Sequence, residues 1–219
     1  MVRPPFWLRA NGEVRRVAAG PESGAATCYW EVAVDDCYGL FAYASRAQPR
    51  VIADVGANVG IFSTLCSMLF PEAAIDAYEP NPAALVWLRQ NAARTRIQVH
   101  PVAVGEAAGM VKLDTTYDST VGRVWDGGDY SVRCISASDI AEGRAIDLLK
   151  IDCEGSEWSV LRDPSLLARS RDCRLEYHLI DGHTEADLRS LFEQGRQLIS
   201  VWHRTSDGRS GVIHSTRRH

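Results

Sequence analysis

The stretch Val51-Ile52-Ala53-Asp54-Val55-Gly56-Ala57-Asn58-Val59-Gly60 decides the fold of this 219-residue chain. Its first five residues form a short, mostly apolar run, which is typical of strands buried on both faces of a parallel sheet. The run that follows, residues 61–69, places Ile61 and Leu65 on one face of a helix. The pattern therefore predicts a strand, a glycine-rich turn and a helix. In an open α/β sheet such a turn borders the crevice where ligands bind.

Alternation of strand and helix continues through the rest of the chain. We predict further strands over residues 74–78, 97–104, 145–151, 174–180 and 197–205, and helices over 82–93, from 156 and over 184–194. Alternating units of this kind form a parallel sheet with helices on both faces. Asp207-Gly208 then turns the chain into a last strand over residues 211–215. The prediction is an α/β fold with a doubly wound sheet of seven strands, of which the last is antiparallel.

The first 48 residues follow a different pattern, and we predict a short β-rich N-terminal extension there rather than an independent domain. Two strand pairs are predicted, over residues 6–9 with 13–17 and over residues 27–34 with 38–43. Asn11-Gly12 is a hairpin-turn dipeptide between the strands of the first pair. Asp35-Asp36 stands at the turn of the second pair. The main, ligand-binding domain is predicted to span residues 49–219.

The residues between the two glycines of the turn argue against a dinucleotide. The fingerprint G-x-G-x-x-G would need glycine at the positions of Asn58 and Ile61. A pattern D-x-G-x-x-x-G instead suits a neutral nucleoside with an amino-acid tail, because no pyrophosphate has to be cradled. Without a Cβ, glycine permits a sharp turn and the close approach of a ligand. We expect the cofactor loop to comprise Asp54, Gly56, Ala57, Asn58 and Gly60.

An acidic residue lies at the position where a nucleoside ligand needs a carboxylate for its ribose. Glu79 ends the second predicted strand, and Pro80 stops that strand directly after it. A carboxylate at this place can accept hydrogen bonds from both hydroxyls of a ribose. After the third predicted strand, Ala103 or Val104 is expected to lie against the adenine ring. The glycine loop and the acid together predict a nucleoside site.

Three segments that carry these residues resemble the FkbM-type family of methyltransferases. They are Val55 to Ser63, Tyr78-Glu79-Pro80-Asn81, and Asp147-Leu148-Leu149-Lys150-Ile151-Asp152-Cys153-Glu154-Gly155-Ser156-Glu157. The resemblance covers about residues 50 to 180. It implies a Rossmann-like class I methyltransferase fold with S-adenosylmethionine as methyl donor. It also implies that the acceptor is a hydroxyl on a sugar or a polyketide-like natural product.

An alcohol that accepts a methyl group loses a proton, so we looked for a base on the same rim of the sheet. Asp152 is the first candidate, either as base or as the carboxylate that orients the methionine end of the cofactor; it could equally cap the next helix. Glu176 and His178 lie two apart on a strand and so face the same side. A neutral imidazole is a ready base near pH 7, and the glutamate could orient it. Glu154 and Glu157 could equally be acids that interact with a helix dipole, which is the interpretation we favour for Glu157.

The same residues leave a metal site open as an alternative. Asp152, Glu176 and His178 are acceptable ligands for a divalent cation, but nothing else in the sequence requires one. None of the six cysteines forms a C-x-x-C pair. We therefore predict a site without a metal.

Charge and hydrophobicity indicate which kinds of partner the protein can bind. The formal net charge of −4 provides no cationic surface for nucleic acid. No apolar run is long enough to span a membrane, and the start of the chain lacks the pattern of a signal peptide. We expect a cytoplasmic enzyme with a small-molecule acceptor; the sequence does not indicate an oligomeric state.

Two other functions remain open at this stage. One is a nucleotide-dependent oxidoreductase or epimerase on the same architecture, and the other is a module that binds the cofactor without turnover. The acceptor is expected to be selected by residues 1–48 and by the loop from Thr115 to Tyr130, where Tyr117 and Trp125 could stack on a ring.

Overall fold

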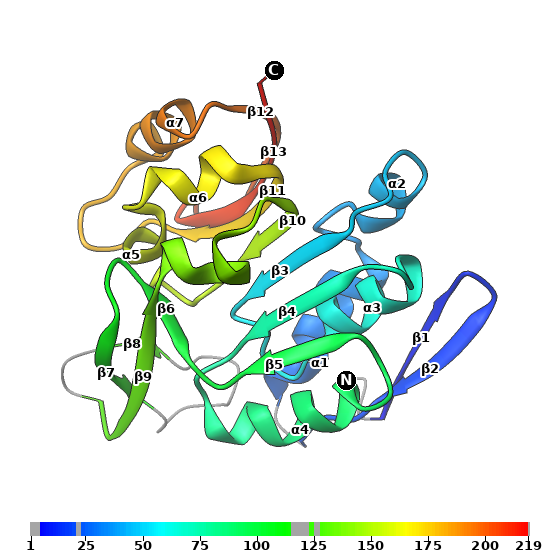
Figure 1. Ribbon diagram of the computed structural model, residues 1–219. Helices are drawn as coiled ribbons and strands as arrows, with labels where there is room; N and C mark the ends of the chain where they lie inside the picture. The colour runs from blue at the N-terminus through cyan, green and yellow to red at the C-terminus, as the bar shows by residue number, and fades with distance from the viewer. Residues whose placement is uncertain (1–4, 21–22, 115–122, 125–127, 219) are drawn as a thin grey trace.

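A seven-stranded sheet forms the centre of the molecule (Figure 1). The structure is a computed structural model, and it describes residues 5–20, 23–114, 123–124 and 128–218. In spatial order the strands are β12 (Gln197–Arg204), β13 (Ser210–Arg217), β11 (Ser170–His178), β10 (Ile146–Ile151), β3 (Val51–Val55), β4 (Ala74–Tyr78) and β5 (Ile97–His100). Strands β5, β4, β3, β10 and β11 are parallel, and β13 is antiparallel to both of its neighbours. The predicted sheet, with its antiparallel last strand, is confirmed.

The order of the strands places the ligand crevice. β3 is followed along the chain by β4 and β5 on one side, while β10 and β11 lie on the other side. The winding direction therefore reverses between β3 and β10. Ligands bind outside the carboxyl ends of the strands at such a switch point.

Helices cover both faces of the sheet, and each face has its own hydrophobic core. α3 (Ile61–Leu69) and α4 (Pro82–Ala92) pack on one face together with the N-terminal residues. The other face is covered by a 3₁₀ segment (Ala137–Gly143), α5 (Glu157–Leu161), α6 (Pro164–Arg169) and α7 (Glu185–Gln194). Asn81 caps α4 through a hydrogen bond from the Ala83 amide at 2.9 Å, with Pro82 in the first turn.

A second, smaller sheet was not predicted. Its strands are β6 (Ala103–Gly105), β9 (Tyr130–Ser136), β7 (Gly109–Asp114) and β8 (Arg123–Val124), in that spatial order. The single strand predicted over residues 97–104 is wrong, because the chain breaks at Pro101 into β5 and β6, which belong to different sheets. Proline has no amide hydrogen with which to continue the ladder.

The first N-terminal strand pair is confirmed, as β1 (Phe6–Ala10) and β2 (Glu13–Val17). Asn11 and Gly12 have φ angles of 50° and 78°, as a two-residue hairpin turn requires. The Asn11 side-chain amide donates to the Met68 and Leu69 carbonyls at the end of α3, at 2.9 and 3.2 Å. The tip of the hairpin is thereby attached to the main domain.

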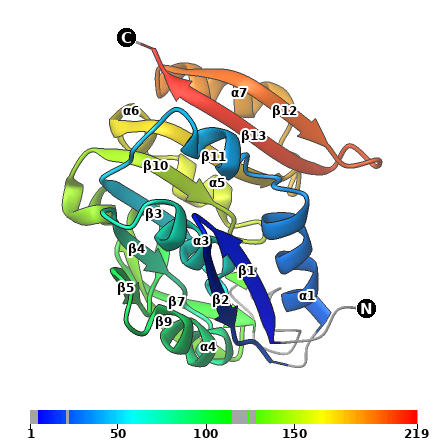
Figure 2. The ribbon, with the colours of Figure 1, turned by 90° about the vertical axis from the view of Figure 1, so that its right-hand side faces the viewer.

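The second predicted strand pair is wrong, because this part of the chain is helical. It contains α1 (Ser23–Tyr29), a π-helical turn (Trp30–Val34) and α2 (Leu40–Ala44). The β-branched and aromatic residues favoured strands, but Ala25 and Val32 are buried in the core shared with α3, and this packing overrides local propensity. Asp36 accepts the Leu40 and Phe41 amides at the start of α2 instead of turning a hairpin. Figure 2 shows α1 and the β1–β2 hairpin on the same side of the molecule.

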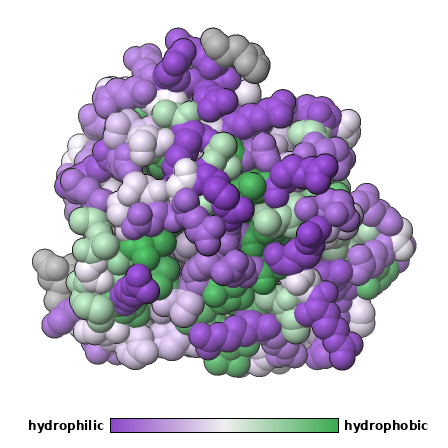
Figure 3. Space-filling view, in the orientation of Figure 1, coloured by the Kyte–Doolittle hydropathy of each residue, from purple (hydrophilic) through white to green (hydrophobic). Residues whose placement is uncertain are grey.

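The surface carries no continuous hydrophobic belt on the face seen in Figure 3, where hydrophobic areas are separated by hydrophilic ones. Within the described ranges, no helix has the length and apolar character needed to cross a membrane.

Candidate active site

An open cleft lies at the carboxyl ends of β3, β4 and β10. The empty space in it, counted out to its open mouth, is about 580 Å³. The predicted residues that line it are Gly56, Asn58, Glu79, Pro80, Ala103 and Asp152. The structure therefore brings together most of the residues predicted to bind the cofactor.

Gly56 lets the carboxyl ends of two neighbouring strands approach each other. Its φ is +78°, and a Cβ at this position would lie 1.7 Å from the carbonyl oxygen of Asp152. The amides of Gly56 and Ala57 both donate to the Tyr78 carbonyl at 3.0 Å. No other residue can occupy position 56 without moving β10, so this glycine shapes the floor of the cleft.

Gly60 and Ala57 lie behind the cleft. A Cβ on Gly60, whose φ is +87°, would lie 2.6 Å from Cδ1 of Leu88. Gly60 therefore allows α3 to start close against α4, and Ala57 is buried beneath the loop. Both were predicted in the cofactor loop, and the structure gives them packing contacts under it.

Glu79 is held in the wall of the cleft by backbone amides. Its Oε1 accepts from the Asn81 amide and its Oε2 from the Asn58 amide, both at 2.7 Å. Burial raises the pKa of Glu79 to about 7. Each carboxylate oxygen can accept more than one hydrogen bond, so this side chain retains acceptor capacity for two hydroxyls.

Asp54 lies under the loop, where it pairs with Lys150. Asp54 is completely buried, and its Oδ1 is 3.3 Å from Lys150 Nζ, while Ser63 Oγ donates to Oδ2 at 2.6 Å. Lys150 Nζ also donates to the Gly56 carbonyl at 2.6 Å and lies 3.2 Å from Asp152 Oδ2. Burial alone would lower the pKa of Lys150, but Asp54 and Asp152 raise it well above its usual value.

No role was predicted for Lys150, although its position inside an apolar strand indicates a buried, paired lysine. A lysine within the apolar strand Ile146–Ile151 must be paired if it is buried. Its partner follows from register, because Lys150 stands opposite Asp54 in the pairing of β10 with β3. Lys150 links the glycine loop to the end of β10.

Asp152 is the candidate base that reaches the cleft. Its side chain is 21% exposed, and its Oδ2 is 3.2 Å from both Lys150 Nζ and the hydroxyl of Tyr38. Glu176 does not line the cleft; its Oε2 lies 3.0 Å from the same Tyr38 hydroxyl. Burial, and then the charge of Asp152, raise the pKa of Glu176 to about 8.

His178 pairs with the loop after β10. Its Nδ1 is 3.4 Å from Glu157 Oε1, and its Nε2 is 3.8 Å from Glu154 Oε2. The interaction with Glu157 raises the pKa of His178 to about 9, which favours the protonated ring, whereas a neutral base was expected. Glu157 also accepts from the Cys153 and Gly155 amides at 2.8 to 3.0 Å and thereby fixes this loop.

Asp152, Glu176 and His178 each pair with other side chains of the protein. In the part of the chain that the structure describes, no three His, Cys, Asp or Glu side chains are grouped as metal ligands. Their partners are instead Lys150, Tyr38 and Glu157.

Residues 54–199 match the model of the methyltransferase FkbM domain, and the chain belongs to that family. It is 28% identical to the 31-O-demethyl-FK506 methyltransferase FkbM of Streptomyces tacrolimicus, with 80% of this chain and 82% of that protein covered. It is 29% identical to the hexuronic acid methyltransferase AglP of Haloferax volcanii over 52% of this chain and 50% of that protein.

Solved structures of the same fold are class I methyltransferases. The magnesium protoporphyrin IX methyltransferase of Synechocystis PCC 6803 with bound S-adenosylmethionine aligns with a TM-score of 0.53 and 11% identity, covering 92% of this chain and 100% of that one. The precorrin-6y C5,15-methyltransferase of Geobacter metallireducens GS-15 aligns with a TM-score of 0.50 and 15% identity, covering 81% and 86%. The protein is thus an S-adenosylmethionine-dependent methyltransferase, not the oxidoreductase or epimerase that the sequence left open.

The cleft fits this cofactor. A loop kept free of Cβ atoms at Gly56 and a buried acid with free acceptor capacity at Glu79 suit a nucleoside without phosphates. When bound, S-adenosylmethionine supplies an electrophilic methyl group on a sulfonium.

Proposed function

We propose that this enzyme methylates a hydroxyl oxygen on a small molecule, either a sugar or a polyketide-like natural product. The observation that carries the proposal is the Asp152 carboxylate, which lines the cofactor cleft and is fixed by Lys150 and Tyr38. A hydroxyl acceptor needs such a proton acceptor within reach. The names of two relatives support the proposal, because one acts on an oxygen of a natural product and the other on a hexuronic acid.

In this proposal, different residues of the chain bind the cofactor and remove the proton from the acceptor. Glu79 holds the ribose hydroxyls, the loop at Gly56 and Asn58 lies against the nucleoside, and Ala103 packs against adenine. Asp152 takes the proton of the acceptor hydroxyl, a contribution of about 10²- to 10⁴-fold in rate. Holding the acceptor in line with the methyl group adds the advantage of proximity.

The class of the methyl acceptor and the cellular location of the enzyme are also proposals. Tyr117 and Trp125, which were expected to stack on the acceptor, lie outside the described residues. We infer a small-molecule acceptor rather than nucleic acid, because the net charge is −4. A cytoplasmic location is consistent with six cysteines that are all unpaired in the structure.

Transfer of a radiolabelled methyl group tests the proposal. The purified chain is incubated with labelled S-adenosylmethionine and with 31-O-demethyl-FK506 or a hexuronic acid as test acceptors, and the product is located by mass spectrometry and NMR. We expect a methyl ether, and we expect Asp152→Asn to transfer about 10²- to 10⁴-fold more slowly. Asp139→Asn, at an exposed carboxylate, is the matched control and should transfer at the wild-type rate. A methyl group found on nitrogen or carboxylate, or a fully active Asp152→Asn, would contradict the proposal.

A further inference from the structure

A tyrosine from the N-terminal extension lies between the two carboxylates at the edge of the cleft. Tyr38 is 2% exposed, and its hydroxyl is 3.2 Å from Asp152 Oδ2 and 3.0 Å from Glu176 Oε2. Tyr38 is 114 positions from Asp152 and 138 positions from Glu176 in the chain, so only the fold brings it to them. From the sequence, Tyr38 was predicted to lie in a strand, and no functional role was predicted for its side chain.

The number of hydrogens in this contact is informative. A phenol has one hydrogen and can donate to only one carboxylate at a time. Both distances are short enough for hydrogen bonds, and the second bond requires a proton on one of the two carboxyl groups, which then donates to the Tyr38 oxygen. The geometry therefore accommodates one additional proton shared among Asp152, Tyr38 and Glu176.

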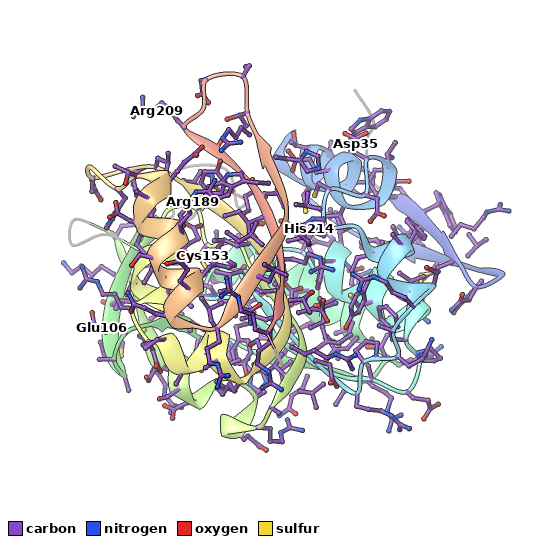
Figure 4. The ribbon with its side chains drawn as sticks, turned by 90° about the horizontal axis from the view of Figure 1, so that it is seen from above. Asp35, Glu106, Cys153, Arg189, Arg209 and His214 are labelled. Carbon is purple, nitrogen blue, oxygen red and sulfur yellow. The ribbon has the colours of Figure 1, made fainter. Side chains whose placement is uncertain are left out.

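The position of Tyr38 is fixed on both sides. Arg174 of β11 donates from Nε to the Tyr38 carbonyl at 2.8 Å, and His214 of β13 binds the neighbouring Cys37 carbonyl at 2.7 Å. Figure 4 shows His214 where β13 meets the N-terminal segment. The ring of Phe62 packs edge-on against the Tyr38 ring at 5.4 Å. The main chain is anchored to the sheet, and the hydroxyl is aimed at the carboxylates.

We propose that the Tyr38 hydroxyl joins Asp152 and Glu176 into one relay, which takes up the proton that the acceptor hydroxyl loses during methyl transfer. This inference rests on the proposed hydroxyl methylation. Asp152 touches the reacting group, whereas Tyr38 and Glu176 act through Asp152 and are positioning residues.

The proton count of the relay balances. As the new carbon–oxygen bond forms, the acceptor O–H bond breaks and its proton passes to Asp152. Asp152 then gives a proton to the Tyr38 oxygen while Tyr38 gives its own to Glu176 Oε2. One proton has moved from the acceptor to Glu176, and the tyrosine is unchanged.

Glu176 is the stable end of the relay because of the groups around it. Its pKa of about 8 results first from burial and then from the charges of Asp152 and Glu31, against opposing effects of Tyr38 and His178. This raised pKa favours a proton on Glu176 at neutral pH, and the relay receives a new proton once Glu176 has ionised. The other ionisable groups around the relay include Cys28 on α1, Lys150 on β10, Cys37 beside Tyr38, Arg174 on β11 and His214 on β13.

Infrared titration of the full chain tests the shared proton without any acceptor. The carboxylic C=O band is followed from pH 5 to 10 in the wild type, in Glu176→Gln and in Tyr38→Phe. We expect a carboxyl that titrates near pH 8, that is lost in Glu176→Gln and whose midpoint rises by about one unit in Tyr38→Phe, because the ionised carboxylate loses its donor. Glu142→Gln and Tyr130→Phe, at exposed side chains, should leave the midpoint unchanged.

Methyl transfer with the acceptor found above supplies the second readout. The wild-type rate should rise with pH around pH 8, and Tyr38→Phe should be about 10- to 100-fold slower and lack this rise, while its affinity for S-adenosylhomocysteine is retained. An active enzyme whose Tyr38→Phe variant keeps the rate, the pH profile and the midpoint overturns the relay alone. Absence of hydroxyl methylation in the wild type overturns the proposed function and with it the catalytic role of the relay, whereas the infrared result still decides whether the proton is shared.

Discussion

Replacing Lys150 by methionine removes the cation that lies between Asp54 and Asp152. The ammonium is 3.3 Å from Asp54 and 3.2 Å from Asp152, with a side chain only 5% exposed. Methionine keeps a flexible side chain of similar length but carries no charge. Asp54, which is completely buried, would then keep only the Ser63 hydroxyl as a partner.

Two estimates of the cost agree. Breaking a buried ion pair by removing one partner destabilises a protein by about 3–5 kcal/mol. At 3.3 Å and an effective dielectric constant near 20, the lost attraction is about 5 kcal/mol. Because domains of this size lose roughly 2–4 °C per kcal/mol, Lys150→Met should lower the melting temperature by about 6–20 °C.

Thermal and denaturant unfolding of the wild type, Lys150→Met, Asp54→Asn, their double variant and one control variant measures this effect. Lys112→Met, at the exposed lysine of β7, is the matched control and should change stability by no more than about 0.5 kcal/mol. Adding Asp54→Asn to Lys150→Met should recover about 1 kcal/mol or more, because the unpaired charge is gone. A loss below about 1 kcal/mol in Lys150→Met, or no coupling with Asp54→Asn, would refute the idea that this pair holds the loop.

Three further predictions follow from the site. Glu79→Gln should weaken binding of S-adenosylhomocysteine by about 1.5–3 kcal/mol, and calorimetry that finds equal affinity would exclude Glu79 as the ribose acceptor. Burial raises the pKa of Glu79 to about 7, and ribose hydroxyls favour its ionised form. The affinity of the wild type for S-adenosylhomocysteine should therefore be about tenfold lower at pH 6 than at pH 8, and Glu79→Gln should show no such pH dependence. Gly56→Ala forces a Cβ to within 1.7 Å of the Asp152 oxygen, so it should abolish binding detectable by calorimetry; retained affinity would show that the loop can move. The free enzyme should lose stability as pH rises from about 5 to 9. In the folded chain the pKa values of Glu79, Glu176 and His178 are raised to about 7, 8 and 9, so these groups hold protons that the unfolded chain releases at lower pH. Melting temperatures that increase over this range would contradict these pKa shifts.

The sequence by itself determined the sheet, the glycine loop and the acid at position 79. These depend on signals that are local in the chain: the spacing of apolar residues, the glycines at a turn and a carboxylate directly after a strand. The hairpin at Asn11-Gly12 and the cap at Asn81 were predictable for the same reason, because a turn or a cap involves only neighbouring residues.

Tertiary structure alone decided the helices within residues 23–44, the pairing of Lys150, the raised pKa of His178 and the place of Tyr38. Tyr38 meets Asp152 and Glu176 across 114 and 138 positions of the chain. Such contacts, and the burial that raises the pKa of Glu176, arise only when distant elements pack together. Propensity and spacing carry no information about which groups will share a dry environment, and that environment sets the protonation of this site.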